Sequence, residues 1–357
     1  MVFDTGVVIL VSSIAAFFGL YLIVNLSLNL EFGYTGIPNF GKMLVVLGGA
    51  YIAGYLPGRL LLSMAQIDPS LDYIADNALI VTSINSFLRS FPALGIGILL
   101  LTILIGAAVG AVLGFVAAYP AVRLREEYLA MTLLAMGEVV KIIGYNYKPL
   151  IGGTLGVQVP DPLAAVPSGI RFPLMSVIIL LFALAVFLYI NRLVNSPLGR
   201  VLRAVRDSEA AAETLGKDIV RIRIKILVLS SAIGATAGSL HALYTGGVIA
   251  LTYDRVVWTF WPWVMVLMGG MANNVGVLLG TLVFVTARQL ITFYKGALAP
   301  YIPFDVVWLD YILLGVTLLL ILMYRPDGII PEKTSKTISF EKIAMERLKM
   351  TRGKEGE

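Results

Sequence analysis

The chain has 357 residues, of which 58% are hydrophobic and 14% are charged. Soluble domains have about 45–50% apolar and 25% charged residues, so this composition excludes a soluble globular protein. The formal net charge is +5, but the basic residues flank apolar runs and alternate with acidic ones, which argues against nucleic-acid binding. The sequence predicts an all-α, polytopic helical bundle in contact with membrane lipid.

Apolar runs long enough to cross a bilayer follow one another along the chain. A helix needs about 20 residues to cross a hydrocarbon core of about 30 Å. The stretch 256–292 is too long for one span, and the turn-rich residues Gly269–Gly276 near its centre predict two short helices with a break between them. We predict about nine spans, at 6–26, 39–56, 95–118, 126–145, 170–191 and 223–250, two within 256–292, and one at 306–324.

Gly33, Gly36, Pro38 and Gly41 lie close together between the first two predicted spans. Several helix-breaking residues in one short segment are typical of an unwound helix, whose free backbone N–H groups can bind a substrate carboxylate. The same residues also fit an ordinary turn between two spans, and the sequence leaves both interpretations open. The residues that we predict to line a substrate pathway are Gly33, Tyr34, Thr35 and Gly36, with Gly269 and Gly270 at the later break.

Glycine and charged residues also occur inside the predicted spans. Gly106, Gly110 and Gly114 recur at every fourth position, which predicts close packing of this helix against a neighbour. Glu138 and Lys141 lie three residues apart in the fourth span, where they can neutralise each other as an intramembrane charge pair. Such a pair serves either structure or transport, and we favour the structural role.

The segment 192–225 is a basic insertion between two spans and carries eight of the 27 basic residues. Ser196 before Pro197 predicts a helix start, Asp207–Ser208 predicts a bend, and Gly216 predicts a helix end in the left-handed conformation. An apolar strip lies beside a face with Arg200, Arg203 and Arg206. A basic amphipathic segment of this kind either lies on lipid headgroups or docks onto a partner protein. The strip consists of Val201, Leu202, Val205, Ala212 and Leu215.

Basic residues are concentrated in the insertion and in the tail after residue 324. Because an excess of Lys and Arg in short loops marks the cytoplasmic side, we predict that both segments are cytoplasmic and that the N-terminus lies outside. We divide the chain into a transmembrane domain at 1–324, which contains the insertion 192–225, and a cytoplasmic tail at 325–357. The tail is predicted to hold a short surface helix and a disordered end.

The histidine and tryptophan content does not indicate a metal or catalytic site. His241 is the single histidine, so we predict a hydrogen-bonded packing role for it instead of metal binding. Arg288 is predicted to extend toward the outer membrane interface. Tryptophan and tyrosine are enriched at membrane interfaces, which predicts an aromatic belt. The belt residues are Tyr253, Trp258, Trp261 and Trp263.

Several motifs occur in a characteristic order. The insertion carries Ser196-Pro-Leu-Gly-Arg200 followed by Glu209-Ala-Ala-Ala-Glu213 and Gly216. The other motifs are Phe32-Gly-Tyr-Thr-Gly36 with Gly48-Gly-Ala-Tyr51, Tyr119-Pro-Ala-Val-Arg-Leu-Arg125 with Gly137-Glu138, Met265-Val-Leu-Met-Gly-Gly-Met271, and Tyr324-Arg-Pro-Asp-Gly328. In this order they resemble the permease subunits of branched-chain amino acid ABC transporters. Lys42 departs from the family pattern, which has a small or polar residue there.

The resemblance implies a permease subunit of an ABC importer in the cell (plasma or inner) membrane. Such a subunit pairs with a homologous permease subunit and binds ABC ATPase subunits through its insertion. It receives its amino-acid substrate from an extracytoplasmic substrate-binding protein. The residues that the resemblance assigns to the ATPase contact are Arg203, Arg206, Glu209, Ala210 and Gly216.

The sequence contains no Gly-x-x-x-x-Gly-Lys-[Ser/Thr] nucleotide-binding motif. We therefore expect ATP and Mg on the partner ATPase, and neither a bound cofactor nor enzymatic activity in this chain. One alternative is an ABC permease for another small solute, such as a sugar, a nucleoside, urea or an amide. Another is an ion-coupled secondary transporter that uses Glu138, Lys141 and Arg288 as coupling charges. The ordered insertion favours the ABC importer, because ion coupling does not require it.

Overall fold

The computed structural model describes residues 2–332 except for 66, 69, 70, 125, 299, 301–304, 306 and 307. Most of these residues are helical. Two short strands, β1 (Val157–Gln158) and β2 (Gly247–Val248), pair antiparallel. The predicted all-α, polytopic class is confirmed, whereas the helix predicted in the tail lies outside the described residues.

Among the described residues, seven helices are long and apolar enough to cross a membrane, and two apolar helices are shorter, at Val256–Gly269 and Tyr311–Ile321. These nine segments lie at the positions of the nine predicted spans. The long helices are α1 (Val2–Leu28) with its π-helical continuation η1 (Asn29–Gly33), α2 (Lys42–Met64), α4 (Pro92–Arg123), α5 (Glu126–Asn146), α7 (Ser168–Val194), α10 (Ile219–Thr245) and α12 (Asn274–Phe293). The shorter ones are η3 (Val256–Phe260) with α11 (Trp261–Gly269), and α14 (Trp308–Tyr324).

Several helix boundaries differ from the predicted ones. The break after Gly269 is present, but α12 beyond it has 20 residues and is not short. α2 continues through Pro57 to Met64, beyond the predicted end at 56. The connection before α4 contains α3 (Asn77–Ser90), an amphipathic helix that was not predicted. Short helical turns at α6 (Lys148–Ile151), η2 (Ala250–Thr252) and α13 (Lys295–Leu298) lie in the remaining connections.

Small residues bring α4 and α10 close together at the centre of the bundle. A Cβ atom at Gly110 would lie 2.3 Å from the Cβ of Ala235, and one at Gly114 would lie 2.5 Å from the Oγ of Ser231. Gly106 faces the same helix, since its added Cβ would lie close to Ser239. The predicted role of these three glycines in close helix packing is confirmed.

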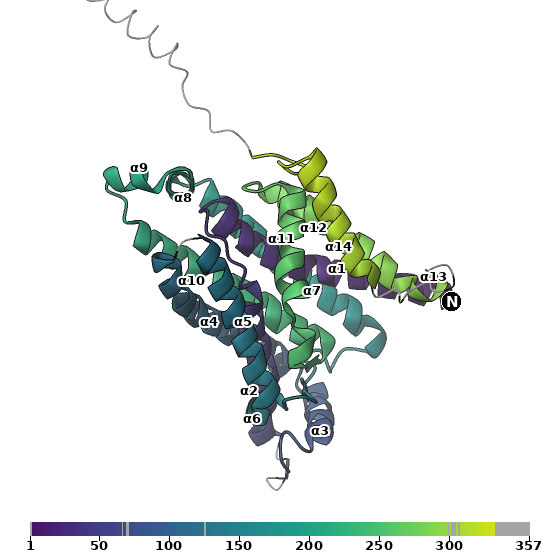
Figure 1. Ribbon diagram of the computed structural model, residues 1–357. Coiled ribbons are helices and arrows are strands. Elements are labelled where there is room, and N and C mark those ends of the chain that lie inside the picture. The colour runs from purple at the N-terminus through teal and green to yellow at the C-terminus, as the bar shows by residue number, and fades with distance from the viewer. Residues whose placement is uncertain are drawn as a thin grey trace, which may run out of the picture.

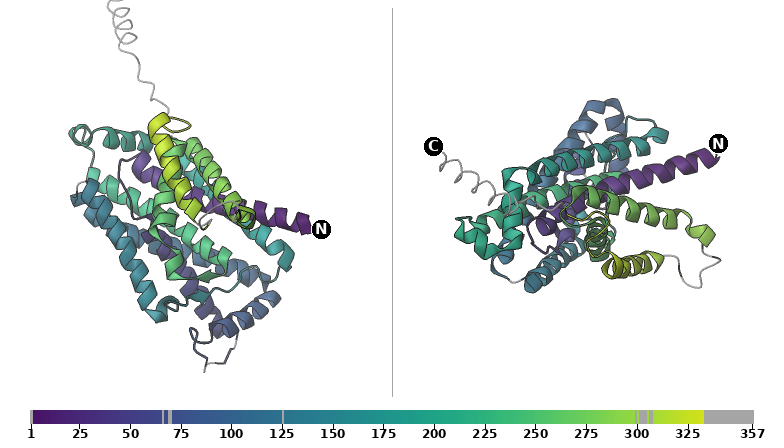
Figure 2. Two further views of the ribbon diagram at one scale, coloured as in Figure 1. Left: turned by 45° about the vertical axis from the view of Figure 1, so that its right-hand side comes forward. Right: turned by 90° about the horizontal axis from the view of Figure 1, so that it is seen from above.

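The polar segments lie at two opposite ends of the bundle (Figure 1). The insertion, which contains α8 (Pro197–Asp207) and α9 (Glu209–Thr214), lies at one end with the end of α14. At the other end lie α3 and α6 (Figure 1). Both views of Figure 2 show the N-terminal part of α1 extending on the side away from the insertion. The insertion and the start of the tail therefore lie at the same end of the bundle, as predicted. That this end faces the cytoplasm stays a prediction.

The aromatic residues of the predicted interfacial belt are buried inside the chain. Their exposed fractions are 1% for Tyr253, 1% for Trp258, 2% for Trp261 and 7% for Trp263. The prediction is wrong because Trp258 stacks between Tyr21 and Tyr253. In addition, α11, which carries Trp261 and Trp263, contacts α1, α12 and α14. His241 has its predicted packing role, since its Nδ1 lies 2.9 Å from the hydroxyl of Tyr253.

Candidate functional site

The basic insertion folds into two short helices whose ends are fixed by capping residues. The Ser196 side chain accepts a hydrogen bond from the backbone N–H of Leu198 at the start of α8. Ser208 accepts one from the backbone N–H of Ala211 at the start of α9. Gly216, with a φ of 73°, ends this region in the left-handed conformation. The predicted start, bend and end of the helical insertion are confirmed.

The apolar strip of the insertion is largely covered by the chain itself. Val205 and Ala212 pack with Ile219, at the start of α10, in a small apolar cluster. Leu215, in contrast, is 75% exposed. The insertion is therefore anchored to the bundle by most of its strip and presents a single exposed leucine after α9.

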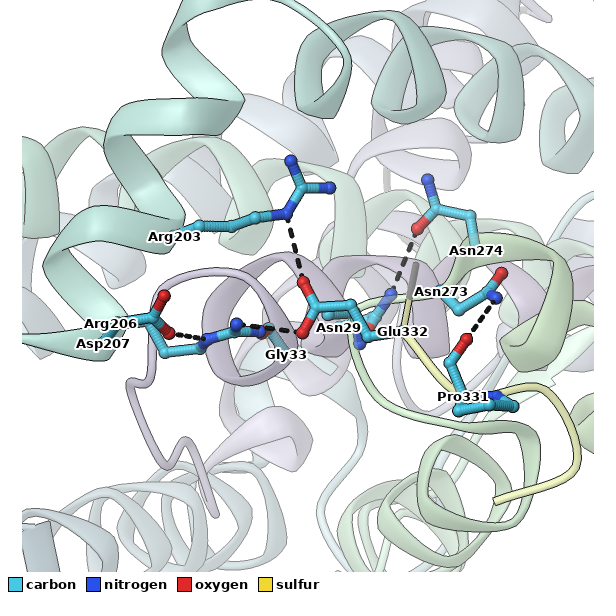
Figure 3. Close-up of polar contacts among 10 residues, drawn as sticks. Asn29, Gly33, Arg203, Arg206, Asp207, Asn273, Asn274, Pro331 and Glu332 are labelled. Carbon is cyan, nitrogen blue, oxygen red and sulfur yellow. Dashed lines mark hydrogen bonds and ion pairs between the residues drawn. The ribbon is translucent and has the colours of Figure 1, made fainter. Parts of the chain in front are cut away.

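Arg203 and Arg206 point toward the bundle (Figure 3). The Nε atom of Arg203 lies 3.1 Å from Oε1 of Glu332, and Nη2 of Arg206 lies 2.9 Å from Oε2. Arg206 also donates a hydrogen bond through Nη1 to the carbonyl of Gly33 at 2.6 Å. Burial alone lowers the pKa of Arg206, but hydrogen bonds to Glu332 and Asp207 outweigh it and raise the pKa above its usual value. We call these four side chains and the Gly33 carbonyl the arginine–glutamate cluster.

Glu332 lies in a segment that is fixed to the turn between α11 and α12. The backbone N–H groups of Ile329 and Ile330 donate hydrogen bonds to the carbonyls of Met268 and Gly269, at 2.8 and 3.0 Å. The side chain of Asn273 donates one to the carbonyl of Pro331 at 3.0 Å (Figure 3). The arginine–glutamate cluster therefore joins the insertion to this turn.

Gly269 and Gly270, which were predicted to line a pathway, form part of the same turn. A Cβ atom at Gly269 would lie 2.3 Å from the carbonyl oxygen of Gly276, and one at Gly270 would lie 2.1 Å from that of Ile330. Gly270 also has a φ of 112°, a conformation that favours glycine. Close backbone contacts account for both glycines, and their contact with a substrate stays a prediction.

The glycine-rich break lies against the insertion. α1 ends in the π-helical η1, and the chain stays non-helical from Tyr34 to Gly41 before α2 begins. Gly33 and Gly36 line a cavity of about 630 Å³ together with Arg206 and Glu332. Of the predicted pathway residues, these two glycines thus lie at an open cavity, at the end that carries the insertion.

Tyr34 and Thr35 are buried within this break. The Cζ atom of Arg203 lies 5.2 Å from the centre of the Tyr34 ring. Burial raises the pKa of Tyr34 to about 12, so the phenol stays neutral at physiological pH. The Thr35 hydroxyl donates a hydrogen bond to the carbonyl of Leu30 at 2.9 Å. Both side chains hold the break in its shape, and a direct contact with substrate stays a prediction.

A buried ion pair flanks the break, and the sequence analysis missed it. Nζ of Lys42 lies 2.7 Å from Oε2 of Glu31, and both side chains are 0% exposed. The hydroxyl of Ser230 on α10 donates a hydrogen bond to Oε1 of Glu31. The sequence did contain a signal, because two opposite charges stand at the edges of apolar runs on either side of a glycine-rich and proline-rich segment. The pair connects the end of α1 to the start of α2.

The remaining predicted site residues lie outside the arginine–glutamate cluster. Glu209 forms an ion pair with Arg223, while Ala210 and Gly216 are exposed on the insertion. Elsewhere, Glu138 and Lys141 form the predicted pair on α5, with 2.5 Å between Oε2 and Nζ.

These contacts form a continuous connection from the insertion to the interior. Arg206 on α8 holds the carbonyl of Gly33, and Glu31, two residues earlier, holds Lys42 at the start of α2. Hydrogen bonds to charged groups contribute roughly 1.5–3 kcal/mol each, so they resist separation. Hydrogen bonds and ion pairs thus connect α8 to the ends of α1 and α2.

Comparison with known proteins places the chain in a family. The family described as branched-chain amino acid transport system / permease component matches residues 10–322. The probable branched-chain amino acid transport permease protein LivM of Methanocaldococcus jannaschii is 46% identical over 339 residues, which cover 94% of this chain and 98% of that protein. The high-affinity branched-chain amino acid transport system permease protein LivM of Escherichia coli is 28% identical, over 87% of this chain and 68% of its own length.

A more distant relative carries a different name. The probable branched-chain amino acid transport permease protein LivH of Methanocaldococcus jannaschii is 22% identical over 82% of this chain and 84% of that protein. No solved structure gives a significant match. Because the family match covers most of the sequence and one relative is 46% identical over nearly its whole length, this chain belongs to the permease components of branched-chain amino acid transport systems.

Proposed function

We propose that this chain is the membrane-spanning permease subunit of an ATP-driven importer for branched-chain or related amino acids. Its relatives carry the names of branched-chain amino acid transport permeases. ATP and Mg bind to separate ATPase subunits, which dock on the insertion at the cytoplasmic side of the cell membrane. The N-terminus lies outside, where an extracytoplasmic binding protein delivers the substrate. A homologous permease subunit completes the pathway, and the LivH relative supports such pairing between related chains.

The two faces of the insertion support this proposal most directly. Its arginines hold Glu332 and the Gly33 carbonyl, while Ala210, Leu215 and Gly216 are exposed. In the proposal, the exposed face binds the ATPase and the arginines transmit its movement to α1. Nucleotide must then favour one arrangement of the spans over another, because a ligand shifts an equilibrium only through its differential affinity.

Leu215→Asp is expected to release the ATPase from the tagged chain when the complex is purified from its native membrane, because it puts a charge on the exposed contact face. Co-purifying proteins are identified by mass spectrometry, and ATP hydrolysis is measured. Leu79→Asp is the matched control, since Leu79 is 59% exposed and lies on α3 at the opposite end. Recovery of the folded wild-type chain with no ATPase contradicts the proposal and favours an ion-coupled transporter.

Arg206→Gln is expected to keep the ATPase bound but to lower ATP-driven leucine uptake in proteoliposomes about tenfold or more. The physical reason is the loss of charge-assisted hydrogen bonds that contribute roughly 1.5–3 kcal/mol each. Glu332→Gln should act in the same direction, and the loss in the double variant should be smaller than the sum of the two single losses, because each single variant already breaks the Arg206–Glu332 ion pair. Release of the ATPase by Arg206→Gln would instead show that this side chain is a direct partner contact.

A further inference from the structure

A second cavity lies at the end of the bundle opposite the insertion and has a volume of about 670 Å³. α1 contributes Phe17 and Tyr21, α10 contributes His241, and α12 contributes Arg288 to its wall. Pockets of about 300–1,000 Å³ are typical of sites for small molecules. The cavity is large enough for a single amino acid, and the proposed function does not yet assign it a role.

The rim of this cavity is built from three segments that are distant in sequence. Val157 in β1 pairs with Val248 in β2, which joins the connection before α7 to the connection after α10. The side chain of Asn77 at the start of α3 accepts a hydrogen bond from the backbone N–H of Gln158 at 2.6 Å. Asn77, Val157 and Gln158 all line the cavity, so these contacts hold its mouth in a defined shape.

The walls combine one cation with large apolar and aromatic side chains. Among the described residues that line the cavity, Arg288 is the one that carries a charge at neutral pH. Its Cζ atom lies 4.0 Å from the centre of the Trp261 ring and 5.9 Å from that of Phe17. Ring contacts of this kind orient a guanidinium, whose planar fork suits a carboxylate. Tyr21 and Trp258 stack at 5.4 Å and supply an apolar surface nearby.

We propose that this cavity is the outward-facing substrate site, in which Arg288 binds the carboxylate of an apolar amino acid and the aromatic wall contacts its side chain. A guanidinium beside aromatic rings matches a ligand that has a negative group at one end and a hydrocarbon group at the other. The site rests on the proposed function, because it identifies where the transported amino acid binds on the side that receives it. The predicted extension of Arg288 toward the outer membrane interface stays a prediction, and Arg288 lines a cavity at the end of the bundle that we propose to face outside.

The test uses three probes on the full-length chain purified in detergent. They are leucine, isovalerate, which keeps the carboxylate and the branched side chain, and leucinamide, which lacks the carboxylate. Binding is followed by tryptophan fluorescence, since Trp258 lines the cavity. Leucine and isovalerate are expected to bind, and leucinamide is expected to bind about 10- to 100-fold more weakly, because it loses charge-assisted hydrogen bonds.

Arg288→Gln is expected to weaken leucine binding by a similar factor, so that leucine and leucinamide then bind about equally. Arg288→Lys keeps a positive charge and is expected to bind leucine more tightly than Arg288→Gln does, but less tightly than the wild type. Arg59→Gln is the matched control, because the Cζ atom of Arg59 lies 3.9 Å from the Tyr55 ring centre, outside the residues that line the cavity. Equal binding of leucine and leucinamide to the wild type would overturn the site. An equal loss of leucine binding in Arg288→Gln and Arg59→Gln would overturn it as well. Loss of the ATPase partner with this binding intact would overturn only the proposed function.

Discussion

Lys42→Met is expected to lower the free energy of unfolding by about 3–5 kcal/mol, because it leaves Glu31 as a buried charge without its ion-pair partner. Both side chains are 0% exposed and their charged atoms are 2.7 Å apart. The loss is measured as the change in the unfolding midpoint in detergent micelles during a titration with a denaturing detergent. Glu31→Gln should also destabilise the chain, because it leaves the Lys42 ammonium buried.

Two further variants decide whether the ion pair is the cause. Replacing both residues, with Glu31→Leu and Lys42→Met, is expected to recover most of the stability, since a buried pair exchanged for apolar residues is often neutral. Arg221→Met is the control, because it removes a charge from an exposed ion pair on the insertion. Nε of Arg221 lies 3.3 Å from Oδ2 of Asp218, and the side chains are 74% exposed for Arg221 and 52% exposed for Asp218. Its effect should stay below about 1 kcal/mol. A double variant as unstable as the single ones would exclude this explanation.

Local signals in the sequence predicted the spans and the insertion well. Ser196, Ser208 and Gly216 act through hydrogen bonds and backbone angles within a few residues, so their roles follow from the sequence alone. The same holds for the small-residue face of α4, because helix periodicity brings Gly106, Gly110 and Gly114 to one side.

Contacts between distant segments were not predictable in this way. Glu31 and Lys42 meet because the chain turns back between α1 and α2, and no periodicity relates positions on either side of such a turn. Glu332 is 129 residues from Arg203, so the arginine–glutamate cluster depends on how α14 packs. The tryptophans of η3 and α11 fit an interfacial belt and a buried core equally well by residue type. Only the helices around α11 decide between the two.

Gly238→Leu is expected to destabilise the chain by more than about 3 kcal/mol, because overpacking at a backbone contact cannot be relieved by a side-chain movement. A Cβ atom at Gly238 would lie 1.9 Å from the carbonyl oxygen of Val46, and one at Gly49 would lie 1.9 Å from that of Ala235. These reciprocal contacts show that α2 and α10 cross with their backbones touching. Even Gly238→Ala should lower the free energy of unfolding by about 1–3 kcal/mol.

Gly97→Ala separates this packing effect from the general effect of removing a glycine from a helix. Gly97 also lies inside a long helix, α4. Apart from the adjacent residues and backbone of α4 itself, no heavy atom of the described residues lies within 4 Å of the position of an added Cβ there. Alanine stabilises a helix interior by roughly 0.5–1 kcal/mol relative to glycine, so this variant should be at least as stable as the wild type. If Gly238→Ala behaves like Gly97→Ala in the same detergent titration, the two backbones are not in contact at this crossing. If only Gly238→Ala is destabilised, the backbones of α2 and α10 are in direct contact at this crossing, and neither helix can accept a side chain there.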